Sequence, residues 1–515
     1  MLKVWAALPY LIAVSALLLS AGCVVGPNYH RPPLPPAQAY SPAPLPASTA
    51  SIPGIAAGAA QSFSTGRSIS AQWWTLFRSP ALNKLIERAF AANPTIDAAV
   101  GALKEAQENV YAQRGYFYPA VQVSYQGERT KLSGNTATSS APGPQGNGEN
   151  ITPLAPAQPV TYNFHTAQVT VGYVPDVFGL NRRQVESLQA QADAARYQLD
   201  AAYLTLASNV VAAALQEAAT RAQIEAVRTI IRSNQRSLAI LHGQLESGYA
   251  ARLDVAQQEL ALAQAQALLP PLSRQLEQTR DLIRALAGNA PDQDVPETFT
   301  LAALHLPERL PLSLPSQLIE QRPDVLAAEE QVRSASAEVG VAVANRLPQF
   351  SLSAALGGQA TKITQLFGNS GTFWSVIGSA SQPLFDAGTL HHRQNAAEQA
   401  LAQAAAQYRS TVLTAFQNVA DTLHALYADA DALKSALAVE QAAGVTLRLT
   451  QQQFRVGYTN GLAVLAAQQA YQQAVIGRVQ AQAARLGDTA ALFQALGGGW
   501  WNAPPAAGDR APAQP

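Results

Sequence analysis

The sequence predicts an α+β membrane protein in which long antiparallel helices carry four β-strands, and in which this plan occurs twice along the chain. Three observations predict it. Hydrophobic residues recur at heptad spacing over two very long stretches. Four shorter segments alternate apolar and polar residues, and the same landmarks return about 210 residues further on.

Composition excludes several classes of protein. The chain has 515 residues, with 34 basic and 34 acidic side chains and one cysteine. A zero net charge argues against a nucleic-acid partner, which needs excess Lys and Arg. The 48% hydrophobic content argues against wholesale disorder. One cysteine can form neither an internal disulfide nor a cysteine-based zinc site.

The N-terminus predicts export and lipid attachment. Residues 1–22 have one basic residue, an apolar run and small residues, which is the layout of a secretory signal peptide. Ser20-Ala21-Gly22 before Cys23 resembles a bacterial lipobox, whose cysteine is acylated and becomes the mature N-terminus. Val24 then favours the outer membrane. The alternative is an ordinary cleaved signal with an unused cysteine.

The segments outside the repeat are expected to lack a packed core. Residues 23–70 combine the lipidated end with a proline-rich stretch, which we expect to be an extended tether. Residues 501–515 are expected to be disordered. No later stretch is apolar enough for a membrane helix, so a membrane span would need a closed β-barrel.

The two repeats cover residues 71–300 and 301–500, and each is expected to contain the same elements in order. The first half carries a longer insertion, for which 132–160 is the candidate. Each half should have a first helix, two strands, a very long helix and a returning helix. The helices are expected at 80–115, 180–247 and 252–287, and at 316–345, 387–455 and 462–496. Pro270-Pro271 should bend or split the first returning helix.

The strands are expected at 119–127, 165–173, 350–356 and 372–384. In the first, Val121, Val123 and Tyr125 alternate with polar residues, and the segment lengths match transmembrane strands. The smallest such barrels need about eight strands. Either the four strands form a soluble sheet, or several chains pool them. The outward signal and the lipid anchor favour pooling.

Several ordered motifs resemble the TolC-like outer membrane factors of the OprM/NodT type. They are Cys23-Val-Val-Gly-Pro-Asn-Tyr-His-Arg-Pro32, Asp176-Val-Phe-Gly-Leu-Asn-Arg-Arg183, Leu314-Pro-Ser-Gln-Leu-Ile-Glu-Gln-Arg-Pro-Asp324, Pro383-Leu-Phe-Asp-Ala-Gly388 and Ala495-Leu-Gly-Gly-Gly-Trp500. The resemblance implies a homotrimer with a 12-stranded β-barrel in the outer membrane and a helical barrel in the periplasm. It also implies a periplasmic adaptor and an inner-membrane pump, for which we expect a proton-driven one.

The resemblance places a closed periplasmic aperture on the second returning helix, at Leu462, Ala466 and Gln469. Relatives such as OprM carry Asp and Arg where this chain has Ala466 and Gln469, so a charged latch is absent. The nearest charges to a helical tip are Asp254 and Arg252. We hypothesise that closure relies on Leu462 and on one of these charges, and is weaker. The alternative is equally tight closure by different residues.

Two Gly-Tyr pairs should end the long helices, because glycine adopts the conformation that terminates a helix. These pairs are Gly248-Tyr249 and Gly457-Tyr458, and the resemblance makes them the tips that an adaptor contacts.

The sequence contains no nucleophile elbow, P-loop or HExxH motif, and we expect no catalytic residue, no metal and no cofactor apart from the lipid. The resemblance to outer membrane factors implies instead a passive outer-membrane exit duct for small toxic compounds or drugs. The alternatives are a type I protein-secretion duct and a lipid-tethered periplasmic coiled-coil scaffold, with a hydrolytic enzyme a distant third.

Overall fold

A computed structural model describes residues 24–33, 39–66, 69–132, 160–368 and 370–502. The predicted signal peptide, Cys23, most of the insertion at 132–160 and most of the tail lie outside the described residues. The chain divides into two compact units. The first contains the described residues up to His30 with Gln107–Ala190 and Arg333–Ala402, and the second contains the remainder. Each unit therefore combines segments from both sequence repeats.

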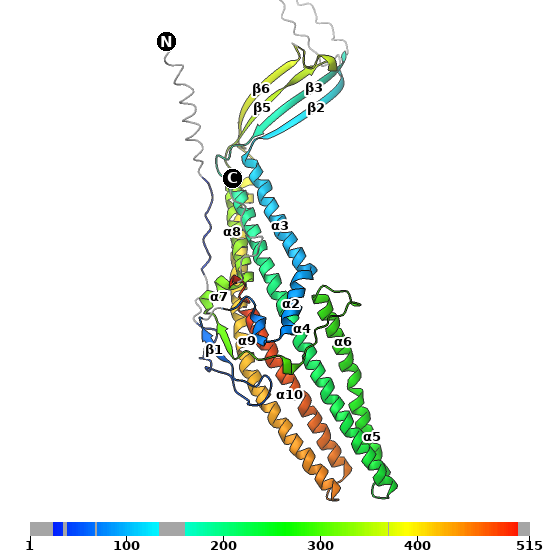
Figure 1. Cartoon of the computed structure of the whole chain (residues 1–515). Helices are drawn as coiled ribbons and strands as arrows, with labels where there is room; N and C mark the ends of the chain where they lie inside the picture. The colour runs from blue at the N-terminus through cyan, green and yellow to red at the C-terminus, as the bar shows by residue number, and fades with distance from the viewer. Residues whose placement is uncertain (1–23, 34–38, 67–68, 133–159, 369, 503–515) are drawn as a thin grey trace, which may run out of the picture. The chain divides into compact units, whose positions relative to one another are not determined.

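The predicted internal repeat is confirmed by the order of the elements (Figure 1). Each half runs from a helix through two strands to a helix of 67 residues and a returning arm. In the first half these are α3 (Pro94–Arg114), β2 (Ala120–Leu132), β3 (Val160–Tyr173), α4 (Leu180–Glu246), α5 (Arg252–Ala267) and α6 (Leu269–Leu286). In the second half they are α8 (Pro323–Ala344), β5 (Gln349–Ala360), β6 (Thr372–Ser381), α9 (Thr389–Arg455) and α10 (Gly461–Ala495).

Prolines set the helix boundaries in both halves. The returning arm is split between α5 and α6, as Pro270-Pro271 predicted. The prediction of single first helices is wrong, because α2 (Pro80–Ala92) precedes α3 and α7 (Pro315–Gln321) precedes α8. Asn93 and Arg322 each stand before a proline with ψ of 120° and 124°. The residue before a proline avoids the helical conformation, so the helix breaks there in both repeats.

Both 67-residue helices begin at an aspartate supplied by a family-like motif. The Asp176 carboxylate accepts a hydrogen bond from the backbone N–H of Asn181 at 3.0 Å. Asp386 accepts one from the backbone N–H of Leu390 at 2.8 Å. That bond, with others from the same turn, holds the pKa of Asp386 below its usual range. A carboxylate at a helix N-terminus satisfies free amides and the helix dipole.

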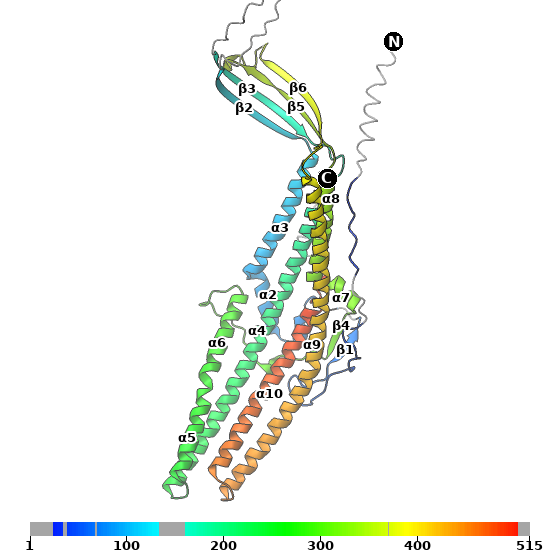
Figure 2. The ribbon, with the colours of Figure 1, turned by 180° about the vertical axis from the view of Figure 1, so that it is seen from behind.

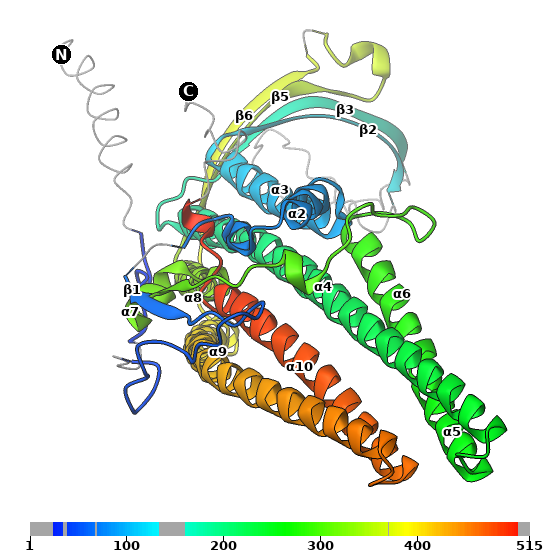
Figure 3. The same ribbon diagram turned by 60° about the horizontal axis from the view of Figure 1, so that its bottom comes forward.

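In the first unit, four antiparallel strands form a curved sheet in the order β2-β3-β5-β6 (Figure 3). Within the described residues, β2 and β6 each pair on one side only, so both are edges. In the second unit, β1 (Ser62–Thr65) pairs in parallel with β4 (Arg309–Leu312). This small sheet was not expected, because four-residue strands give too short a pattern to detect.

In the second unit, α9 and α10 run side by side in both opposite views (Figure 2). The heptad seam predicted on α9 is buried at Val419, Leu423, Leu426, Ala430 and Leu433. Further along α10, Phe493 stacks on Trp73 with ring centroids 5.3 Å apart. The apolar core of this unit therefore combines helical seams with aromatic residues from near the N-terminus.

The proline-rich segment differs from the expected tether. Residues 24–33 form no helix or strand, as expected, but Thr49, Ile52 and Ala57 are buried in the second unit. The cause is Arg485 of α10, which is fully buried. Its guanidinium donates hydrogen bonds to the Thr49 hydroxyl (2.9 Å) and to the carbonyls of Ala50 (3.3 Å), Ala57 (2.9 Å) and Ala59 (2.8 Å). One side chain thus supplies hydrogen-bond donors to the oxygen atoms of a segment that makes few backbone hydrogen bonds of its own.

We predict that Arg485→Met detaches this segment. The substitution leaves several acceptors without a partner, and hydrogen bonds to a charged donor are worth about 1.5–3 kcal/mol each. The purified protein should lose roughly 3 kcal/mol or more of unfolding free energy, and a protease should cut within residues 47–61. Arg448→Met, on an exposed part of α9, is the control. Equal melting temperatures and cleavage patterns for the two variants would contradict the role of Arg485.

Candidate functional site in the sheet faces and helix tips

The strand register places apolar side chains on one face of the sheet. Cross-strand partners share a face, so each row of partners lies wholly on one face of the sheet. Three adjacent rows are Val121-Val171-Ala354-Val376, Val123-Val169-Leu356-Trp374 and Tyr125-Ala167-Gly358-Thr372. On the chain alone Val123 and Trp374 remain 77% and 76% exposed. Exposed apolar rows of this kind are typical of strands that face lipid.

The opposite face is mainly polar. Its rows are Gln122-Thr170-Ala355-Ser375, Ser124-Gln168-Gly357-Phe373 and Gln126-Thr166-Gln359. Near the start of β5, the hydroxyls of Ser351 and Ser379 are 2.7 Å apart across the strand pair. This face carries groups that hydrogen-bond to water, as the lining of a water-filled passage requires.

The two Gly-Tyr pairs form the same helix-ending turn. Gly248 has φ of +78°, and its N–H donates to the Leu245 carbonyl at 3.0 Å. The N–H of Tyr249 donates to the Gln244 carbonyl at 2.7 Å. These two bonds define a Schellman motif, which needs a left-handed residue where the helix stops.

The second turn repeats the first. Gly457 has φ of +81°, its N–H donates to the Phe454 carbonyl at 3.1 Å, and the N–H of Tyr458 donates to the Gln453 carbonyl at 2.9 Å. Tyr249 and Tyr458 are 86% and 87% exposed. The structure thus places four predicted tip residues in two equivalent turns with outward tyrosines. Their contact with an adaptor stays a prediction.

The three predicted aperture residues lie on one face of α10. Leu462, Ala466 and Gln469 follow helical spacing and are exposed, whereas Leu465 between them is buried. The Gln469 side-chain amide donates to the side-chain amide oxygen (Oε1) of Gln264 on α5 at 3.2 Å. A neutral amide pair therefore links the two returning helices.

The two predicted charges have different surroundings. The Asp254 carboxylate accepts a hydrogen bond from the Ala251 N–H at 3.0 Å and caps α5. It also lies against the start of α10, because a Cβ on Gly461 would be 3.2 Å from the carboxylate. Arg252 is exposed. The structure thus brings Asp254 to the start of the second returning helix.

Sequence reasoning missed two residues of this region. Gln264 is the partner of Gln469, and no motif marks it. Leu253 is exposed at the start of α5 and corresponds to Leu462 by the repeat offset of 209 residues. Applying that offset to each aperture residue would have found Leu253.

The described residues offer neither a membrane-spanning helix nor a metal-binding cluster. None of their helices has a segment both apolar and long enough to cross a membrane. They also contain no group of three or more His, Cys, Asp or Glu side chains that could hold a metal ion.

A two-faced sheet joined to very long helices is the architecture of an outer-membrane channel. Comparison with known proteins supports the same class. The family model for the outer membrane efflux protein matches residues 85–289 and 314–498. The chain belongs to this family, and it is an outer-membrane protein of efflux systems.

Relatives and solved structures match over most of the chain. The pyoverdine export outer membrane protein OpmQ of Pseudomonas putida is 29% identical over 83% of this chain and 88% of its own. The toluene efflux pump outer membrane protein TtgC of Pseudomonas putida is 26% identical over 95% of each. The outer-membrane channel OprN superimposes with a TM-score of 0.79 at 25% identity, covering 93% of this chain and 100% of that one. The Campylobacter jejuni CmeC outer membrane channel gives 0.79 at 20% identity, over 93% and 95%.

We predict that Gly457→Ala destabilises the tip through the backbone alone. No atom lies within 4 Å of an added Cβ, so the cost is that of a left-handed alanine, about 1–2 kcal/mol. Gly477→Ala is the matched control, because it has equal space within α10 without a positive φ. It should stabilise the helix by about 0.5–1 kcal/mol. Chemical unfolding measures the change in unfolding free energy for both variants. A Gly457→Ala variant as stable as wild type would refute the assignment of a left-handed glycine at this tip.

We predict opposite outcomes for arginine at two neighbouring positions of β2. Val123→Arg puts a charge on the apolar face and should cost up to about 4 kcal/mol in the membrane. Ser124→Arg puts the same charge on the polar face and should be tolerated. The amount of assembled protein in the outer-membrane fraction measures both. Equal recovery of the two variants would mean that the faces are assigned wrongly.

Proposed function

We propose that the chain is the passive outer-membrane exit duct of a tripartite efflux system. In this role it carries small toxic compounds that an inner-membrane pump loads through a periplasmic adaptor. The observation that carries the proposal is the two-faced sheet, with apolar rows suited to lipid and polar rows suited to water. The toluene efflux and pyoverdine export named for its relatives support a small-molecule cargo.

The duct is proposed to be a homotrimer. Within the described residues, the sheet of one chain has four strands and two open edges, and its apolar face is exposed. Backbone groups inside a bilayer must all be paired, so the edges β2 and β6 need partners from other copies. Three copies would supply twelve strands and close the sheet.

We assign the lipid anchor to Cys23 and periplasmic closure to the returning helices. Acylation at Cys23 would add lipid anchoring to the membrane-embedded sheet. At the other end, exposed Leu462 and the neutral pair Gln264–Gln469 are proposed to narrow the passage. The outward tyrosines of the two turns, Tyr249 and Tyr458, are proposed to contact the adaptor, and the pump, expected to be proton-driven, supplies the energy.

We predict that deleting the gene raises intracellular accumulation of dyes and drugs, and that the wild-type chain reverses this. The compounds affected then identify the cargo class. A well-expressed protein that changes no compound in a broad panel would contradict drug efflux. Comparison of secreted proteins and of envelope integrity would then test the protein-secretion and scaffold alternatives.

The same strain tests the aperture. Leu462→Ser should increase entry of vancomycin and channel conductance, because it removes an exposed apolar contact at the constriction. Leu449→Ser, at an exposed position on α9, is the control. Unchanged entry and conductance in the Leu462→Ser strain would show that Leu462 is not the gate.

A further inference from the structure

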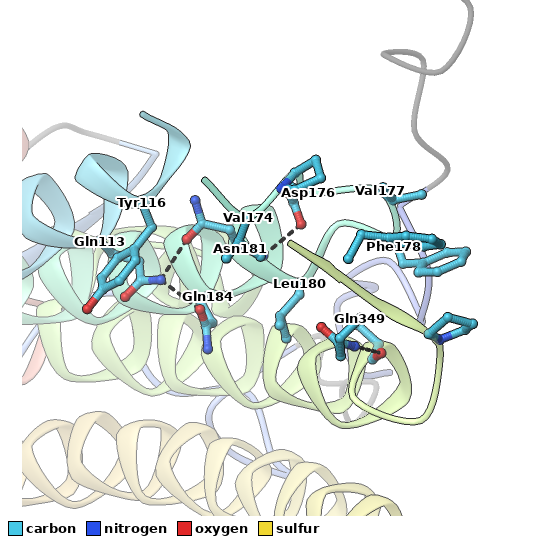
Figure 4. Close-up of a pocket in the computed structure, with 14 residues that line it drawn as sticks. Gln113, Tyr116, Val174, Asp176, Val177, Phe178, Leu180, Asn181, Gln184 and Gln349 are labelled. Atoms are coloured by element: carbon cyan, nitrogen blue, oxygen red, sulfur yellow. Dashed lines mark hydrogen bonds between the residues drawn. The ribbon is translucent and has the colours of Figure 1, made fainter. Parts of the chain in front are cut away.

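A cavity of about 330 Å³ lies in the first unit, where the strands meet the helices (Figure 4). Its walls come from the end of α3, the link between β3 and α4, the start of α4 and the start of β5. The apolar part of the lining includes Val174, Pro175, Val177, Phe178, Leu180 and Phe350. The function proposed above makes no use of this cavity.

The polar side chains of the lining largely bind one another (Figure 4). The Gln113 amide donates to the side-chain oxygens of Asn181 and Gln184, at 2.6 Å each. Asp176, the charged group of the described lining, is paired with Arg182 at 3.1 Å. One buried donor is left over, because the Asn181 Nδ2 atom has no hydrogen-bond partner among the described residues. The cavity therefore suits an apolar chain with a neutral carbonyl better than a charged headgroup.

The chain directly after Cys23 is held against the wall of this cavity. A Cβ added to Gly179 would be 3.0 Å from the Val24 Cα atom, so Val24 packs closely on Gly179. The Val25 N–H donates to the carbonyl of Phe178 at 3.2 Å. Phe178 and Leu180, on either side of Gly179, both line the cavity. Val24, which makes this contact, directly follows Cys23 in the sequence.

A buried arginine fixes this segment in place. The Arg183 guanidinium donates to the carbonyls of Val25 (3.0 Å) and Gly26 (3.2 Å) and to the Asn28 side chain (3.0 Å). Gly26 lies so close to α8 that an added Cβ would be 2.4 Å from the Gly340 Cα atom. Gly340 in turn contacts Arg183, since its own added Cβ would be 2.9 Å from Arg183 Cδ. Gly26, Gly340 and Arg183 thus form a narrow slot that holds the N-terminal segment. The slot needs both glycines and the arginine.

We propose that this cavity receives an acyl chain of the lipid on Cys23, with Asn181 donating to an acyl carbonyl. The inference rests on the proposed acylation of Cys23. Phe350 belongs both to the lining and to the apolar sheet face, because it is four residues before Ala354 on β5 and so lies on the same side of the strand. The cavity is thus continuous with the face assigned to lipid, and the other acyl chains can pass along that face into the bilayer. The slot at Arg183 positions the lipid.

The test uses the full-length protein made in cells fed a photoactivatable fatty acid. After purification and irradiation, mass spectrometry locates the crosslinks of the chains attached to Cys23. We expect them on peptides that contain residues 174–180 and 349–350. Crosslinks spread over exposed strand residues, with none at the cavity, would overturn the proposal.

Two glycine variants test the slot. Gly340→Ala should displace Arg183 and lower the cavity crosslink at least tenfold, while the mass of the acylated N-terminal peptide stays the same. Gly101→Ala is the matched helical control, with no atom within 4 Å of the added methyl group. Equal crosslinking in both variants would overturn the role of the slot.

Two further outcomes separate this inference from the proposed function. An N-terminal peptide without acyl groups would refute both the acylation and the docking. Acylation with an empty cavity would refute the docking alone. A Cys23→Ser protein that crosslinks an added photoactivatable phospholipid at the same peptides, as strongly as wild type crosslinks its own lipid, would assign the cavity to free membrane lipid and overturn the proposal.

Discussion

The register of the four-stranded sheet is the constraint on which the rest of this protein depends. Side chains alternate along a strand, so a slip of one residue would exchange the apolar row of Val123 and Trp374 with the polar row of Ser124 and Gln168. The helices before and after each strand pair must therefore begin and end at fixed residues. The aspartates that cap α4 and α9, and the prolines that start α3 and α8, provide these fixed points.

Much of this fold could be predicted from sequence because its signals are long and periodic. The two 67-residue helices, the four strands and the Gly-Tyr turns follow from heptads, alternation and glycine. The breaks at Asn93 and Arg322 were missed because the apolar pattern continues across each proline. The Gln264–Gln469 contact and the short β1–β4 sheet depend on tertiary neighbours that no local pattern records.

Two buried arginines donate to backbone carbonyl oxygens that in other segments are paired within helices or sheets. The proline-rich N-terminal segment lacks many backbone donors and cannot form an extended ladder. Arg183 holds its first residues, and Arg485 holds residues 49–59, each through several carbonyl oxygens. A guanidinium has five N–H donors in a planar array, so one side chain can replace a strand partner. A segment that composition marks as a tether thus becomes an ordered part of both units.

The open edges of the sheet have a consequence for biogenesis. Before assembly, each newly exported chain carries unpaired strand edges at β2 and β6 beside exposed apolar rows. Such surfaces pair readily with wrong partners and aggregate. The interval between secretion and membrane insertion is therefore the most hazardous stage in the life of this protein. We therefore expect its yield in a cell to depend on factors that cover those edges, as well as on the stability of the finished fold.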